Sequence, residues 1–275
     1  MPLVNMTATG GGGGDPSVTE LETWDATSDL TAQTITTAGT HTLYASDGTT
    51  ERAELVVTAT GGLASGWSVT CDASASPPIL ISGVKWSGSG GGGYVSVQVE
   101  PTFATSPDWT RDRWFAEALI GEVTLNGDSA SNSEVVRLGL APKGKIIVET
   151  GSADVMITDS GGSYAWTRET WDDSDSDATS YTTAPSSSML VLCDSLRTRI
   201  AIDNGGTSFA SDLKSTGPWD VDTVGQGQVA SGDDTSAGSY STGLGIMLHA
   251  WSKYEGDGVK VGLSKIKLSV GAPKE

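Results

Sequence analysis

Positive charge, cysteine, histidine and long apolar runs are all scarce in this chain of 275 residues. Only 16 basic residues stand against 34 acidic ones, and a net charge of −18 repels nucleic-acid backbones, which excludes a DNA- or RNA-binding protein. No run approaches the roughly 20 apolar residues that cross a bilayer, so we expect no membrane insertion. The first residues show no basic segment followed by an apolar one, so they predict no signal peptide.

The few cysteines and histidines exclude several kinds of site. Cys71 and Cys193 are too few for a disulfide scaffold, and they are read either as small buried apolar residues or as one cross-strand bridge. His41 and His249 form no zinc-ligand spacing and no plausible catalytic triad. Because the apolar residues of run 244–248 lie on the opposite face of its strand, His249 is expected at the surface or at an edge.

Turn formers and threonine dominate the sequence, and long helical patterns are absent. We therefore predict an all-β fold, in which residues 63–271 form an antiparallel double-sheet jelly-roll sandwich. Residues 1–17 are a flexible Gly-rich tail, residues 18–62 a small β attachment unit that leans on a neighbour, and residues 272–275 a short tail. The Asp47-Gly48 pair predicts a hairpin within the small unit.

Local patterns place several strands and turns. The run "YVSVQVEPTF" puts its valines and Phe103 on one face and Tyr94, Ser96, Gln98 and Glu100 on the other. A turn near Asp194-Ser195 joins two strands, and another at 142–144 does the same. The last strand changes parity between Leu263 and Ile266, which indicates a β-bulge.

Three runs follow one another in a familiar order: "WFAEALIGEVTL" (114–125), then "VVRLGLAPKGKIIVE" with "MLVLCDSLRTRIAIDNGG", and finally "VKVGLSKIKLSV". Over roughly 200 residues this order resembles the concanavalin A-like jelly roll of legume lectins, laminin G domains and one large glycosidase family. Modules of this kind are frequent in tail, fibre and capsid-decoration proteins of tailed viruses, including those of salt-loving archaeal hosts. The resemblance therefore implies a concanavalin A-like sandwich in a virion protein.

Two glutamates on one predicted strand raise the question of catalysis. The glycosidases of this fold use Glu-x-Asp-x-x-Glu, and Glu117 and Glu122 match its first and last positions, with Gly121 able to host the required bulge. Leu119 stands where the motif needs aspartate, so we predict no catalytic residues. Without a bulge, Glu117 lies on the face of Phe115, Leu119 and Val123, where it needs a partner such as Arg137 or Arg199.

Other candidate sites are weaker. Asp173, Asp175 and Asp177 have the alternate spacing of a calcium loop, but the turn glycine is missing and Ala184 replaces the bidentate glutamate. A solvated acidic loop is the simpler interpretation, and we expect no cofactor beyond such a loop calcium ion. The "SGSGGGGY" run lacks the lysine of a phosphate loop and is read as a flexible loop. Five tryptophans near loops are interpreted as core or interface residues, with sugar stacking as the alternative: Trp109, Trp114, Trp166, Trp171 and Trp219.

Three functional hypotheses follow. The first is a non-enzymatic virion structural protein, as capsid decoration, spike or tail fibre, which displays a lectin-like sandwich. Its partners are other virion proteins and copies of itself, with a trimer as the expected homo-oligomer, and it is made in the host cytoplasm and released with the particle. The second is a carbohydrate-binding module that recognises a host surface glycan. The third is a polysaccharide-degrading enzyme.

Overall fold

The structure is a computed structural model, and part of the chain is described. The described residues are 18–26, 28–87, 91–109, 113–125, 133–143, 153–160, 163–170, 179–181, 189–194, 197–203, 243–252 and 258–273. Within these ranges the chain forms sixteen strands and no helix, so none of the described residues lies in a helix long and apolar enough to span a membrane. The prediction of an all-β fold is confirmed.

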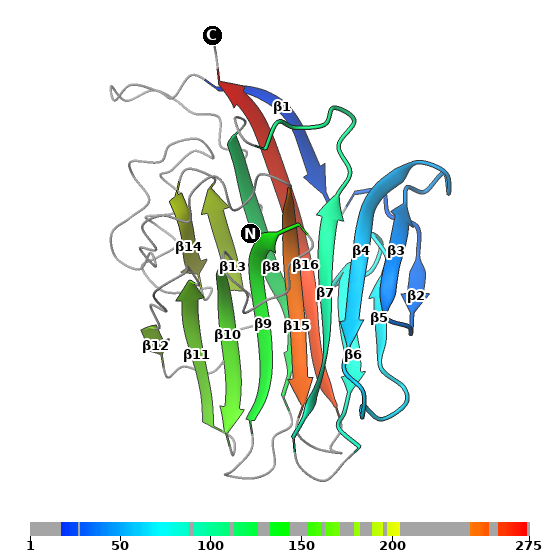
Figure 1. Cartoon of the computed structure of the whole chain (residues 1–275), viewed down its shortest axis with the longest axis vertical. Helices are drawn as coiled ribbons and strands as arrows, with labels where there is room; N and C mark the ends of the chain where they lie inside the picture. The colour runs from blue at the N-terminus through cyan, green and yellow to red at the C-terminus, as the bar shows by residue number, and fades with distance from the viewer. Residues whose placement is uncertain are drawn as a thin grey trace.

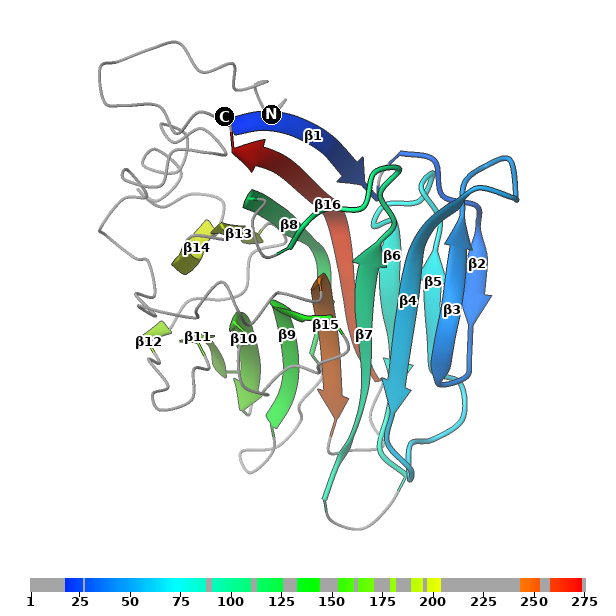
Figure 2. The same cartoon turned by 45° about the horizontal axis from the view of Figure 1, so that its top comes forward.

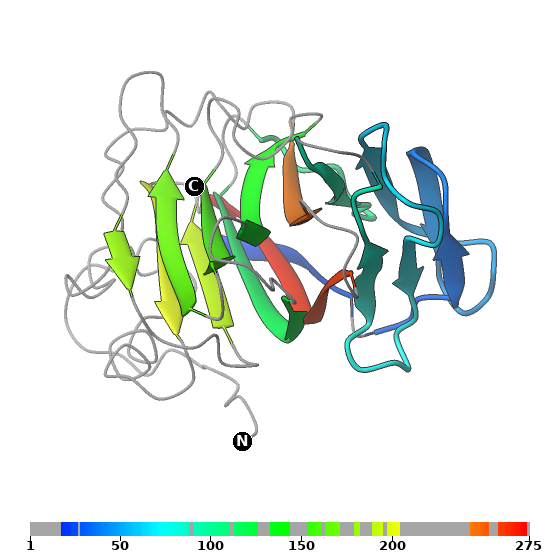
Figure 3. The same cartoon turned by 90° about the horizontal axis from the view of Figure 1, so that it is seen from below.

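The described strands form two sheets, in which every pairing is antiparallel. Sheet A runs in the order β14 (Arg197–Asp203), β13 (Met189–Asp194), β8 (Arg113–Thr124), β16 (Val259–Pro273), β6 (Ile79–Val84), β5 (Ser68–Cys71) and β2 (Gln33–Ile35), and β1 (Val18–Asp25) also pairs with β16. Sheet B runs in the order β12 (Thr179–Tyr181), β11 (Ser163–Thr170), β10 (Ala153–Ser160), β9 (Ser133–Pro142), β15 (Leu244–Ser252), β7 (Gly93–Pro101), β4 (Glu51–Ala59) and β3 (Gly39–Tyr44). Figure 1 shows sheet B in front of sheet A, and Figure 3 shows the two layers from below.

One hydrophobic core lies between the sheets, as expected of a β-sandwich. Both sheets contribute fully buried aliphatic residues to it, which from sheet A include Val69, Ile79, Ile81, Val261, Leu263, Ile266 and Leu268 and from sheet B include Leu55, Val95, Val97, Val99, Val136, Leu138, Ile246 and Leu248. Alternate residues of β4 and β7 enter this core because side chains alternate between the faces of a strand.

The central pair of sheet A, β8 and β16, contains two bulges. The register between the strands skips Gly121 in β8 and Ser264 in β16. The extra residue in β16 allows Leu263 and Ile266, three positions apart, both to reach the core, where neither is exposed. The bulge predicted from the parity change is therefore confirmed, and the bulge that Gly121 was able to host is present.

Residues 18–62, grouped by the sequence into a small unit, are hydrogen-bonded into both sheets. Strands β1 and β2 belong to sheet A, while β3 and β4 belong to sheet B. The predicted hairpin at Asp47-Gly48 joins β3 to β4, and the side chain of Asp47 accepts hydrogen bonds from the amides of Thr49 and Thr50, each at 2.8 Å. The neighbour on which these strands lean is thus the main sandwich itself.

The strand pair predicted around residues 194–195 is confirmed, because β13 pairs with β14 and Asp194 lies opposite Arg197. The strand predicted just after the 142–144 turn falls outside the described residues. The next described strand after β9 is β10, which continues sheet B as β9–β10–β11–β12.

Candidate functional site

The outer face of sheet B, which points away from the core, is buried at its centre. Ser96, Gln98 and Glu100 on this face of β7 are only 3%, 4% and 4% exposed. The alternation in the sequence correctly assigned the core face, but it gave no indication that the polar face is buried too. Buried polar groups need hydrogen-bond partners, so this face is a structured region of the protein.

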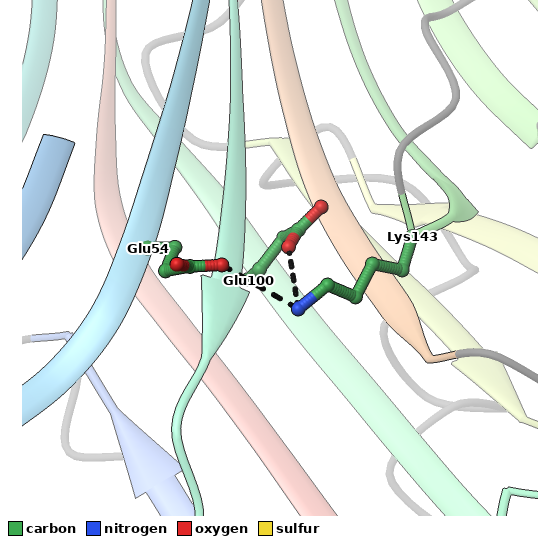
Figure 4. Close-up of polar contacts among 3 residues, drawn as sticks. All are labelled: Glu54, Glu100 and Lys143. Carbon is green, nitrogen blue, oxygen red and sulfur yellow. Dashed lines mark hydrogen bonds and ion pairs between the residues drawn. The ribbon is translucent and has the colours of Figure 1, made fainter. Parts of the chain in front are cut away.

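Three charged residues form what we call the acid–lysine cluster: Glu54, Glu100 and Lys143. Glu54 on β4 and Glu100 on β7 lie directly opposite each other in the register, and Lys143 follows the end of β9. The Lys143 Nζ atom lies 3.0 Å from Glu100 Oε2 and 3.5 Å from Glu54 Oε2. Figure 4 shows the lysine reaching toward both carboxylates. The cluster thus joins three strands of sheet B across β15, which lies between β9 and β7.

Two glycines in and before β15 leave room for this network. The Lys143 amide donates to the Gly243 carbonyl at 2.9 Å, and a Cβ at Gly243 would lie 3.3 Å from the Lys143 Cβ. Gly243 also has a φ of +124°, which L side chains rarely adopt. A Cβ at Gly245 would overlap the side chain of Gln98. A larger residue at position 245 would therefore displace the buried Gln98 side chain, and one at position 243 would press on Lys143.

His249 lies on the same outer face, in the C-terminal half of β15. In the register it stands between Ser96 on β7 and Arg137 on β9, and its ring packs against Tyr94 with centroids 4.8 Å apart. Burial, and then the positive charge of Arg137, lower the pKa of His249 to about 3. The imidazole is therefore neutral at physiological pH. Of the two expected positions, the edge is wrong because β15 is a central strand of sheet B, whereas His249 does keep some exposed surface on the outer face.

The geometry of the acid–lysine cluster suits ion pairing better than acid–base catalysis. From the two lysine distances, the Oε2 atoms of Glu54 and Glu100 lie no more than about 6.5 Å apart, a limit that still admits the short carboxyl separation of retaining glycosidases. Such enzymes need room for the sugar between the carboxyl groups, whereas here the ammonium of Lys143 lies there. Its hydrogen bond to Glu100, together with the charges of Glu100 and Glu54, raises the pKa of Lys143, so it stays charged.

The two glutamates singled out from the sequence lie on β8 in sheet A. Glu122 Oε1 lies 2.5 Å from Lys260 Nζ, and both side chains are about one-third exposed. The backbone of Glu117 pairs with Lys267, which is half-buried between the core residues Ile266 and Leu268. The register thus fixes the backbone of Glu117 opposite Lys267, and the bulge at Gly121 separates it from Glu122. The expected position of Glu117 on the core face follows only when β8 has no bulge.

Neither suggested arginine is the register partner of Glu117. Arg137 lies on the outer face of sheet B beside His249. The side chains of Glu117, Leu119 and Arg199 are outside the described part of the structure.

The cysteine question is answered for one residue. Cys71 is a free thiol with no exposed surface, and burial raises its pKa to about 12. Its strand β5 is separated from β13, which carries Cys193, by three intervening strands. At about 4.8 Å per strand this spacing is far beyond the reach of a disulfide. The interpretation of Cys71 as a buried apolar residue is confirmed.

The structure describes one of the five tryptophans in full, Trp109, and part of the glycine run before Tyr94. Trp109 packs against the core and lies edge-on to Phe103, with centroids 6.2 Å apart, which confirms its structural role. The glycine run, read as a flexible loop, contacts indole rings where it is described. A Cβ at Gly92 would overlap Trp251, and a Cβ at Gly93 would lie 2.9 Å from Trp86.

The remaining candidates contribute little. His41 Nε2 lies 3.0 Å from the Thr37 carbonyl oxygen. The possible calcium loop with Asp173, Asp175 and Asp177 lies outside the described residues, as do the side chains of the other four tryptophans: Trp114, Trp166, Trp171 and Trp219.

The acid–lysine cluster was missed from the sequence because its members come from three distant segments. Glu54 and Lys143 are 89 residues apart, and neither belongs to a recognisable motif. Comparison of the chain with protein-family models, with curated proteins and with solved structures gives no match.

Proposed function

We propose that this protein is a non-enzymatic structural component of a virus particle, which displays a concanavalin A-like jelly roll as capsid decoration, spike or tail fibre. The observation that best supports this proposal is the acid–lysine cluster. In it a charged lysine pairs with the facing carboxylates of Glu54 and Glu100, and so serves to hold strands together.

The arrangement of the chain ends also favours a displayed module. Val18 pairs with Pro273, so β1 begins beside the end of β16 (Figure 2). An attachment through residues before β1 would leave the opposite end of the sandwich pointing outward. The sequential run β9–β10–β11–β12 in sheet B, followed by a return to sheet A at β13, is compatible with the jelly-roll connections proposed here.

The test of this proposal is the composition of purified particles. The protein should appear at fixed stoichiometry, and its deletion should lower infectivity or particle stability. Its absence from purified particles, with normal expression in infected cells, would overturn the proposal. Incubation with polysaccharides should release no reducing ends, and release that survives in a Lys143→Met variant would point to an enzyme instead.

A carbohydrate-binding module is the second candidate, and one observation favours it. Tyr94, His249 and Trp251 lie together on the outer face of sheet B, and each retains some exposed surface. Aromatic rings beside an arginine are suited to stacking on a sugar. A glycan array supports this candidate when binding is lost in Tyr94→Ala and retained in Tyr44→Ala, a tyrosine on the edge strand β3.

A further inference from the structure

The first strand, β1, is attached to the sandwich along one edge, and we propose that it is exchanged between copies of this chain. Among the described strands it pairs only with β16, from Val18 opposite Pro273 to Asp25 opposite Lys267. It occupies the part of that edge beyond β6, which pairs with residues 259–263 (Figure 2). The proposal rests on the homo-oligomer proposed from the sequence, and it names β1 of a second copy as the partner.

The site that receives β1 is specific for this strand. Trp24 is fully buried in the core, and Thr23 Oγ1 lies 3.0 Å from Ser269 Oγ. The carboxylate of Glu22 accepts a hydrogen bond from the Ala104 amide at 2.8 Å. These partners lie 246 and 82 residues away along the chain, so β1 of a second copy would make the same contacts without loss.

The connection between β1 and β2 has the properties of a hinge. Its described residues, 26 and 28–32, include Asp29, whose φ of +64° is rare for a residue with a side chain. A hydrogen bond of 2.9 Å from the Ser46 amide to the Asp29 carboxylate holds this turn in place. Short connections under strain favour exchange, because opening the hinge lets the backbone return to an extended conformation.

Association by joining sheet edges is less well supported. The edge of β3 is already used, since the carbonyls of Thr42 and Tyr44 accept hydrogen bonds from the Gln33 side chain and the Thr31 amide. On β1 the register skips Leu21, and a bulge in an edge strand hinders pairing with another sheet. Exchange of β1 avoids both obstacles because it uses only contacts that already exist.

Disulfide trapping between singly substituted copies tests the exchange. Thr23→Cys and Ser269→Cys copies, with both natural cysteines replaced by alanine, are refolded together and oxidised. Because each copy carries one thiol of a directly paired position, a Thr23–Ser269 bridge forms only when β1 crosses to the other copy. The matched control is Ser68→Cys with Ser82→Cys, an equally close pair at 3.1 Å within one hairpin, which has no reason to exchange.

Exchange predicts a covalent dimer containing one copy of each variant in the first mixture, and none in the control. Asp29→Gly should lower the dimer yield because glycine adopts the left-handed conformation without strain, whereas Asp29→Pro should raise it. The proposal is overturned when no mixed dimer forms although a Thr23→Cys/Ser269→Cys double variant forms the disulfide within one chain. It is also overturned when that double variant forms no disulfide between these two positions at all. Presence in particles without mixed dimers rejects only the exchange, and mixed dimers without presence in particles reject only the virion function.

Discussion

Replacing Lys143 by methionine removes the cation of the acid–lysine cluster while keeping much of the side-chain volume. The side chain of Glu100 is only 5% exposed, and it would lose the Lys143 ammonium that lies 3.0 Å away. The like charge of Glu54, directly opposite on β4, would remain. Breaking a fully buried ion pair costs about 3–5 kcal/mol. Since Lys143 and Glu54 are 48% and 45% exposed, water screens part of this loss, and we expect a decrease of about 1–3 kcal/mol in the free energy of unfolding.

The assay is equilibrium denaturation in urea, followed by tryptophan fluorescence, at several pH values. The raised pKa of Lys143 means that its contribution is complete below pH 10.5 and is lost as the pH rises through the folded-state pKa. The difference between wild type and Lys143→Met should therefore shrink at strongly alkaline pH.

Lys260→Met is the matched control, because it removes an ammonium from a partly exposed partner, Glu122. Exposed pairs contribute about 0–1 kcal/mol, so this variant should lose clearly less stability than Lys143→Met. Equal losses in the two variants, or a Lys143→Met loss that does not change with pH, would refute the reasoning that the burial of Glu100 gives the cluster its strength.

Three further predictions concern single buried groups. The pKa of His249, lowered to about 3, lies below that of the unfolded chain, so the unfolded state binds the extra proton between about pH 6.5 and 3. As the pH falls through that window, the free energy of unfolding should decrease by up to about 1.4 kcal/mol per pH unit. His249→Gln should remove this part of the pH dependence. Trp24→Phe should cost at most about 1.5 kcal/mol, because the buried indole nitrogen has no hydrogen-bond partner to lose, whereas Leu55→Ala should cost about 2–5 kcal/mol; equal losses in unfolding titrations would contradict this. Cys71, buried and with a pKa of about 12, should react with iodoacetamide only after denaturation, and rapid labelling of the native protein at this residue would show that the thiol is accessible.

Strands were predictable wherever a local pattern carries the information. The parity change between Leu263 and Ile266 indicated a bulge because both residues are apolar and only one arrangement buries both. The Asp47-Gly48 hairpin was equally readable, since two adjacent residues determine the turn. Short-range geometry of this kind needs no knowledge of the rest of the chain.

The pairing of distant segments was not predictable in this way. The joining of β1 to β16 depends on a partner about 250 positions away, as the Thr23–Ser269 contact with its separation of 246 residues shows. The ion pair of the buried Glu100 on β7 likewise depends on the position of Lys143, which in the sequence is an ordinary turn residue. A polar residue on an alternating strand is exposed by default, and only tertiary contacts reveal the exceptions.

The distribution of cations bears on what the acidic residues of this protein do. With 34 acids and 16 bases in the chain, most carboxylates must be balanced by solvent and ions. Yet Lys143 lies between Glu54 and Glu100, and Lys260 lies beside Glu122. Acids at a turn instead use nearby donors, as at Asp47, where hydrogen bonds from the hydroxyl and the amide of Thr50 and from the amide of Thr49 lower the pKa to about 2. The scarce lysines near strand carboxylates thus neutralise charge between strands of the same sheet.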